Sequence, residues 1–148
     1  MGPNVTDDLA SHLAKCGSLR SLKMANTQLT DKGVSHLADL PNVESLILRG
    51  SPITKDCLPG ISGMSSVKVL DLSETKIDGG LADLSKLSNL EWLLLNEVEI
   101  KDESFASIAD CSKLSRLSII KSVIDENSIT DLKEKRPDIN VEQIGATE

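Results

Sequence analysis

Apolar residues recur along the chain with a period of 23 to 25 residues. In one copy of the pattern, Val67 is followed by apolar residues three, five and ten positions later, at Leu70, Leu72 and Ile77. The copies begin at Leu19, Val43, Val67, Leu90, Leu114 and Ile139. Self-similarity of this kind predicts a repeat protein in which each unit packs against its neighbours.

Each repeat contains two hydrophobic spacings. Its first half alternates apolar and polar residues, as in Leu70-Asp71-Leu72, which predicts a short strand. Its second half places apolar residues three positions apart, as at Phe105, Ile108 and Cys111, which predicts one face of a helix. Strands joined by helices run parallel, and such crossovers are right-handed in nearly all proteins. The pattern therefore predicts an α/β fold.

Polar residues and glycines refine the helix boundaries. Thr6, Thr30 and Asp102 precede acidic residues and are expected to be helix N-caps. In the second repeat, residues 57–64 contain a proline and two glycines, so we expect a single turn or a 3₁₀ piece in place of a regular helix. Gly79-Gly80 coincides with a one-residue deletion and predicts a tight turn.

The repeat resembles the leucine-rich-repeat family. The residues that carry the match are Leu19-x-x-Leu22-x-Met24-x-x-Thr27-x-Leu29-Thr30-Asp31 and its copies, over residues 5–144. Residues 29–42 resemble the helix-bearing, ribonuclease-inhibitor-like branch. The resemblance implies a right-handed solenoid with a parallel sheet on the concave side and helices on the convex side.

Many family members carry asparagine in a column that here holds mostly hydroxyl residues. The column consists of Thr27, Ser51, Thr75, Val98 and Ser122. We therefore expect the family's asparagine ladder to be replaced by hydroxyl groups and to be interrupted at Val98.

We expect residues 1–148 to form a single domain. It comprises a partial repeat over 5–18, repeats that start at 19, 43, 67, 90 and 114, and a short terminal strand over 139–144. Near the C-terminal end, Arg136 replaces a core residue and Pro137 stops the last helix. We expect a monomer. The strand near residues 19–24 has no predicted neighbour on one side, so edge-to-edge dimerisation is the alternative.

The residues between the strand leucines predict a binding surface. Leucines of the LxxLxL pattern point into the solenoid, whereas the intervening residues face the concave surface, which no helix covers. The candidate partner-binding residues are five apolar residues expected to stand in solvent, Ile47, Val69, Trp92, Leu94 and Ile120, and their charged neighbours Arg49, Asp71 and Arg116. An apolar cluster with a polar rim is typical of protein-binding hot spots. Alternatively, a neighbouring domain covers these residues, since scattered exposed apolar residues are common.

Acidic residues near this surface suggest electrostatic steering of a basic partner. Asp71, Glu74, Glu91 and Glu97 are expected to form a strip on or beside the concave sheet.

Composition narrows the class of protein. The net charge is −7, and Phe105 and Trp92 are the only aromatic residues, so the core must be aliphatic and nucleic-acid binding is disfavoured. No apolar stretch approaches the roughly 20 residues of a membrane span.

The N-terminus has no secretory signal pattern, and three widely spaced cysteines suit reduced, semi-buried thiols in the cytoplasm. Asn4-Val5-Thr6 is a formal glycosylation sequon whose use we do not expect.

The pattern favours binding over catalysis. His12 and His36 share one helical column without a carboxylate or cysteine column beside them, so we expect no metal, no cofactor and no catalytic residue. We predict a protein-interaction module that binds a protein or peptide on its concave sheet. Two alternatives stay open: the substrate-recognition arm of a larger enzyme complex, such as a ubiquitin-ligase subunit or a bacterial effector, and a passive spacer.

Overall fold

Six short parallel strands form one sheet in the order of the sequence. The computed structural model describes residues 5–144, and each strand pairs in register with the next. The strands are β1 (Ser21–Lys23), β2 (Ser45–Ile47), β3 (Val69–Asp71), β4 (Trp92–Leu94), β5 (Arg116–Ser118) and β6 (Asn140–Glu142). Each of the first five begins two residues after the start of its repeat. The expected parallel sheet is confirmed.

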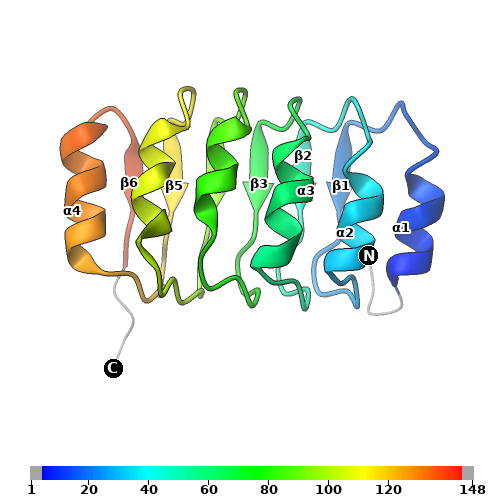
Figure 1. The fold of residues 1–148 in the computed structure, drawn as a ribbon, viewed down its shortest axis with the longest axis horizontal. Coiled ribbons are helices and arrows are strands. Elements are labelled where there is room, and N and C mark those ends of the chain that lie inside the picture. Colours follow the sequence, from blue (N-terminus) through cyan, green and yellow to red (C-terminus); the bar gives the residue numbers. More distant parts are fainter. Residues whose placement is uncertain (1–4, 145–148) are drawn as a thin grey trace.

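Helical segments form a second layer on one side of the sheet (Figure 1). They are α1 (Asp7–Leu13), α2 (Asp31–Leu37), η1 (Lys55–Cys57), α3 (Leu58–Ser62), η2 (Leu81–Lys86), η3 (Glu103–Asp110) and α4 (Glu126–Lys135), where η denotes a 3₁₀ helix. The convex segments of the third and fourth repeats are 3₁₀ helices, which the spacing of three residues does not distinguish from α-helices. The second repeat holds a 3₁₀ turn and an α-helix of only five residues, as expected in place of a regular helix. Pro59 is tolerated there because it lies in the first turn, where no intrahelical hydrogen bond is lost.

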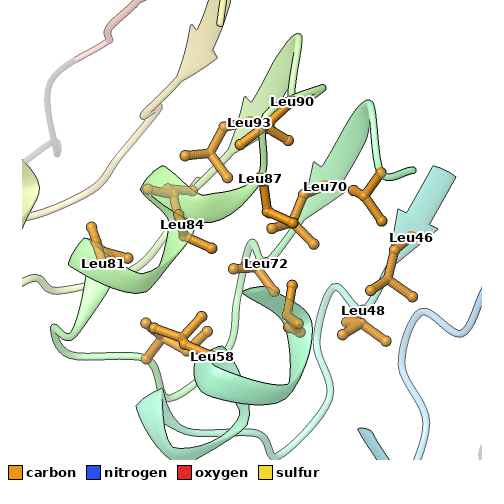
Figure 2. Close-up of a cluster of buried hydrophobic side chains, with 14 of the residues drawn as sticks. Leu46, Leu48, Leu58, Leu70, Leu72, Leu81, Leu84, Leu87, Leu90 and Leu93 are labelled. Atoms are coloured by element: carbon orange, nitrogen blue, oxygen red, sulfur yellow. The ribbon is translucent and has the colours of Figure 1, made fainter. Parts of the chain in front are cut away.

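Leucines from both layers fill the interior of the solenoid. Leu70 and Leu93 point inward from adjacent strands and meet Leu58, Leu81 and Leu84 from the convex segments (Figure 2). All five are completely buried, and so is Phe105. The core is aliphatic apart from this one ring, as the composition predicts.

Aspartates tie the start of one convex helix to the start of the next. The carboxylate of Asp7 accepts hydrogen bonds from the backbone N–H of Thr30 at 2.9 Å and from its hydroxyl at 2.7 Å. Asp31 accepts the same two bonds from Thr54. Burial acts to raise the pKa of Asp7, but the bonds from Thr30 and the charge of Lys32 outweigh it and leave this pKa below its usual value. These bonds join successive repeats.

The Thr30 hydroxyl donates to Asp7 and accepts no capping hydrogen bond from its own helix, contrary to the expectation. Thr6 also lacks a side-chain capping bond. Asp102 does cap its segment, by accepting from the Ser104 backbone N–H at 3.0 Å. It also accepts from Gly80 at 2.9 Å.

The Gly79-Gly80 turn needs both of its glycines. A Cβ on Gly79 would lie 2.1 Å from a carboxylate oxygen of Asp102, and Gly80 has a left-handed φ of 72°. The chain bends at Gly79, and the Gly80 N–H donates to the Asp102 carboxylate of the next repeat.

Hydroxyl groups replace the asparagine ladder. The Thr27 and Ser51 hydroxyls lie 3.0 Å apart, and both donate to the carbonyl of Met24. Thr75 donates to the carbonyl of Leu72 at 2.7 Å. At Val98 the column has no hydroxyl, as expected from the sequence.

The two ends of the sheet differ. In the described residues, no strand pairs with the outer edge of β1, although α1 extends the helical layer beyond it (Figure 1). At the other end, the Arg136 guanidinium donates to the carbonyls of Ala109, Cys111 and Leu114 at 3.0–3.1 Å. Arg136 thus binds the backbone where the fourth repeat ends and the fifth begins.

No helix within residues 5–144 has the length and apolar character needed to cross a bilayer. Asn4, the acceptor of the formal sequon, lies outside the described residues.

Candidate functional site

The register of the sheet brings the predicted binding residues into rows on its concave face. One row runs across three strands as Val69, Trp92 and Arg116. The next row consists of Ile47, Asp71 and Leu94. Adjacent strands lie about 4.8 Å apart, so neighbours within a row are in side-chain contact range. Two residues from the ends of these strands, Arg49 and Ile120, extend the surface. We call these eight residues the concave patch.

The apolar side chains of the concave patch are half-buried. The sequence had predicted that they stand in solvent. Ile47, Val69, Trp92, Leu94 and Ile120 all have intermediate exposure. The in-register neighbours of Ile47, Val69, Trp92 and Leu94 on the adjacent strands lie within contact range, in line with this partial burial. We call the five half-buried apolar side chains the apolar floor, and Asp71 lies among them.

Arg116 stacks on the tryptophan of this floor. Its guanidinium carbon lies 4.5 Å from the centre of the Trp92 ring, within the range of a cation–π interaction. Among the described residues, Arg116 forms no ion pair with a carboxylate. This arrangement holds the indole in place and leaves one positive charge free for a partner.

A polar network borders the patch on the third row, and the sequence analysis missed it. The Asn96 side-chain oxygen accepts hydrogen bonds from the Ser118 hydroxyl at 2.9 Å and the Ile120 backbone N–H at 2.8 Å. The Asn96 backbone N–H in turn donates to the Ser73 hydroxyl at 3.1 Å. In the sequence, the short polar residues beside the strand leucines could have indicated this network. The network fixes three adjacent strands at the edge of the patch.

Two of the four acids expected to form a strip along this surface are paired with basic residues. Glu74 forms an ion pair with Arg49, and this hydrogen bond raises the pKa of Arg49. Glu97 lies 3.8 Å from the Lys121 ammonium. Asp71 is only 8% exposed, whereas Glu91 is exposed and forms no ion pair within residues 5–144. The strip is therefore partly neutralised by basic residues that the sequence alone does not place beside these acids, and steering of a basic partner stays a prediction.

Alternating charges line the edge of the sheet where the strands begin. Glu44 lies between Arg20 and Lys68 and pairs with both, at 2.6 Å and 2.8 Å. Hydrogen bonds from Lys68 and Arg20 lower the pKa of Glu44. The pairs are exposed, so each adds little to stability. One carboxylate between two cations leaves one positive charge in excess, and the charge of Glu91 on Lys68 opposes it.

The thiols are free, and two of them are deeply buried. Burial, with the charge of Asp31 next, raises the pKa of Cys57 to about 12, and burial raises that of Cys111 to about 11. Cys16 is exposed, contrary to the expectation of a semi-buried thiol. It lies in the partial repeat over residues 5–18, after the end of α1.

Iodoacetamide should therefore alkylate only Cys16 in the folded protein. At about pH 8 we expect one modified thiol per chain by intact mass, and none in Cys16→Ser. All three cysteines should react after unfolding in urea. Rapid modification of Cys57 or Cys111 in the folded state would contradict the packing of these thiols.

The two histidines lie on the neighbouring helices α1 and α2. His12 is exposed on α1, where its Nδ1 lies 2.7 Å from the carbonyl oxygen of Asp8, and His36 is half-buried on α2. Within residues 5–144, no three His, Cys, Asp or Glu side chains gather in a geometry that could hold a metal ion.

Comparison with solved structures defines the class of fold. An internalin, inlF, from Listeria monocytogenes superposes with a TM-score of 0.74 and 22% sequence identity, over 93% of this chain and 38% of that one. The leucine-rich-repeat ectodomain of the plant membrane receptor kinase GASSHO1/SCHENGEN3 from Arabidopsis thaliana, in complex with CASPARIAN STRIP INTEGRITY FACTOR 2, superposes with a TM-score of 0.62 and 22% identity. That match covers 97% of this chain and 17% of the receptor.

No sequence-family model and no curated protein matches the chain. The likeness therefore rests on structure, and the fold is a leucine-rich-repeat solenoid, as the repeat pattern predicts. The chain spans 38% and 17% of the lengths of these two neighbours.

Proposed function

We propose that this solenoid is a protein-interaction module that holds a protein or peptide on its concave patch and performs no chemistry of its own. The observation that carries the proposal is the half-buried Trp92, stacked under Arg116 at the centre of an apolar floor. Tryptophan and arginine are enriched in binding hot spots, where a few central side chains supply most of the binding energy. One structural neighbour, the leucine-rich-repeat ectodomain of GASSHO1/SCHENGEN3, is in complex with CASPARIAN STRIP INTEGRITY FACTOR 2, which supports this use.

Two further assignments accompany this proposal. We propose that the protein belongs to the helix-bearing, ribonuclease-inhibitor-like branch, which the α-helices α1, α2 and α4 support and the 3₁₀ segments of the central repeats do not. We also propose a cytoplasmic location, because free thiols with no disulfide between them suit a reducing compartment.

Loss of the indole should weaken binding without unfolding the protein. Immobilised wild type, Trp92→Ala, Leu94→Asp and Glu103→Ala would be compared by quantitative mass spectrometry of proteins captured from a lysate. A partner should be retained by wild type and by Glu103→Ala, an exposed change on the convex side of the same repeat, and lost by both concave variants. With that partner purified, Trp92→Ala should reduce affinity about 30-fold, which corresponds to roughly 2 kcal/mol.

Circular dichroism must show that the variants remain folded. Equal capture of every protein by wild type, Trp92→Ala and Leu94→Asp would contradict binding at the concave patch.

A further inference from the structure

Asp71 has an unusual environment for a carboxylate. It is 8% exposed, and within residues 5–144 it is the only buried residue that carries a carboxyl or a basic side chain. It lies on β3, at the centre of the concave patch. Its in-register neighbours on both sides are apolar, Ile47 on β2 and Leu94 on β4.

The protein supplies little to balance this charge. One carboxylate oxygen, Oδ1, accepts a hydrogen bond from the Ser73 backbone N–H at 3.0 Å, and no other hydrogen bond reaches the side chain from the described residues. Arg49 directs its guanidinium to Glu74, although the charge of Asp71 also contributes to the raised pKa of Arg49. No lysine, arginine or histidine of the described chain forms an ion pair with Asp71. The Asp71 oxygen that accepts no hydrogen bond keeps contact with solvent, because no fully buried side-chain oxygen of the described residues lacks a partner. A partner that covers this apolar surrounding would remove that solvent, and a cation from the partner would offset the cost.

We propose that Asp71 anchors a lysine or arginine side chain of the bound protein or peptide. This inference rests on the proposed function and specifies the chemistry of the partner. The aliphatic stem of the basic side chain would lie on Ile47 and Leu94, as such stems commonly do on apolar surfaces. An apolar residue next to it in the partner would cover Val69 and Trp92. The recognised segment is therefore a basic residue beside an apolar one.

Charge complementarity favours this occupant over a neutral or acidic one at the same position. A backbone N–H could satisfy the free oxygen of Asp71 but would leave its charge unbalanced, and a carboxylate would be repelled. An acidic group of the partner would bind Arg116, which lies on the far side of Trp92 from Asp71. The two free charges of the concave patch thus have opposite signs and lie on either side of the indole.

A random 12-residue peptide display library, selected on the intact chain, provides the probe. Peptides that bind wild type and fail to bind Trp92→Ala would be sequenced and synthesised, and their affinities measured by titration calorimetry. We expect each to contain lysine or arginine beside an apolar residue. Asp71→Asn should weaken binding about tenfold or more, because a buried charged hydrogen bond is lost. Glu97→Gln, an exposed acid at the rim, is the matched control and should leave affinity unchanged.

A double-mutant cycle separates a direct pair from an indirect effect. Replacing the basic residue of the peptide by methionine should cost the same tenfold or so on wild type and almost nothing on Asp71→Asn. Asparagine keeps the oxygen that accepts from Ser73, so the fold should persist, which circular dichroism checks.

Trp92-dependent peptides that lack basic residues, or that bind Asp71→Asn as well as wild type, would overturn this inference and leave the proposed function standing. Failure to recover any Trp92-dependent peptide would count against both.

Discussion

Leu93→Ala is expected to lower the free energy of unfolding by about 3–4 kcal/mol. Leu93 points inward from β4 (Figure 2), is completely buried and lies in register between Leu70 and Leu117. Truncation removes apolar contacts and leaves a cavity between stacked repeats that cannot close without moving two strands. Urea denaturation followed by circular dichroism measures the change.

The next residue on the same strand is a matched control. Leu94→Ala removes the same atoms from a half-buried side chain on the concave face, so we expect a loss of about 1 kcal/mol or less. A larger loss in Leu94→Ala than in Leu93→Ala would mean that β4 is shifted by one residue, because such a slip exchanges the two faces of a strand.

The strands were predictable because their signal is local and repeated. Leu70-Asp71-Leu72 and its copies fix which side chains point inward, and the same alternation places Trp92 and Leu94 on the concave face. The type of convex helix was not predictable from this pattern. A spacing of three residues brings side chains to one face of an α-helix and of a 3₁₀ helix alike, as Val34 and Leu37 show on α2 and Phe105 and Ile108 on η3.

The environment of the concave patch depends on pairs that are far apart in the sequence. The alternation predicts that Asp71 faces the concave side, but its burial comes from the side chains of β2 and β4, about one repeat away in either direction. The ion pairs of Glu74 and Glu97 likewise join different repeats. A single sequence shows the columns of the solenoid but does not show which side chains within neighbouring columns meet.

The open floor and the rigid core have separate roles in the proposed function. Side chains that point inward, such as Leu93, hold the strands in register, and side chains between them carry the binding chemistry. Because the strands are fixed by the core and by the Asn96 network, little backbone order has to be gained when a partner binds. Variants of the concave patch should therefore change affinity with little effect on stability.

The C-terminal end of the solenoid depends on one side chain. Arg136 occupies the position of the core residues Met64, Leu87 and Cys111 of earlier repeats. Its carbonyl accepts from Ile139 just as theirs accept from the first residue of the next repeat. The side chain of Arg136 is 18% exposed, and its guanidinium donates to the carbonyls of Ala109 and Cys111 in the fourth repeat and of Leu114 at the start of the fifth. The guanidinium also pairs with Asp138 at 2.7 Å.

Arg136→Ala should therefore lower the free energy of unfolding by about 2–3 kcal/mol, since it removes charged hydrogen bonds to several carbonyls at once. Arg136→Lys should recover only part of this, because a single ammonium cannot reach all three acceptors. Asp138→Asn, which breaks the exposed pair and spares the carbonyl bonds, should cost no more than about 1 kcal/mol.

Hydrogen exchange shows which part of the chain Arg136→Ala destabilises. In a solenoid each repeat contacts only its neighbours, so Arg136→Ala should speed amide exchange in α4, β6 and the end of the fifth repeat and leave β1 to β3 protected. Arg116→Ala, an arginine that stacks on the concave face, should not produce this pattern. Uniform acceleration along the whole chain, or unchanged exchange in residues 126–144, would show that Arg136 does not hold the C-terminal end in place.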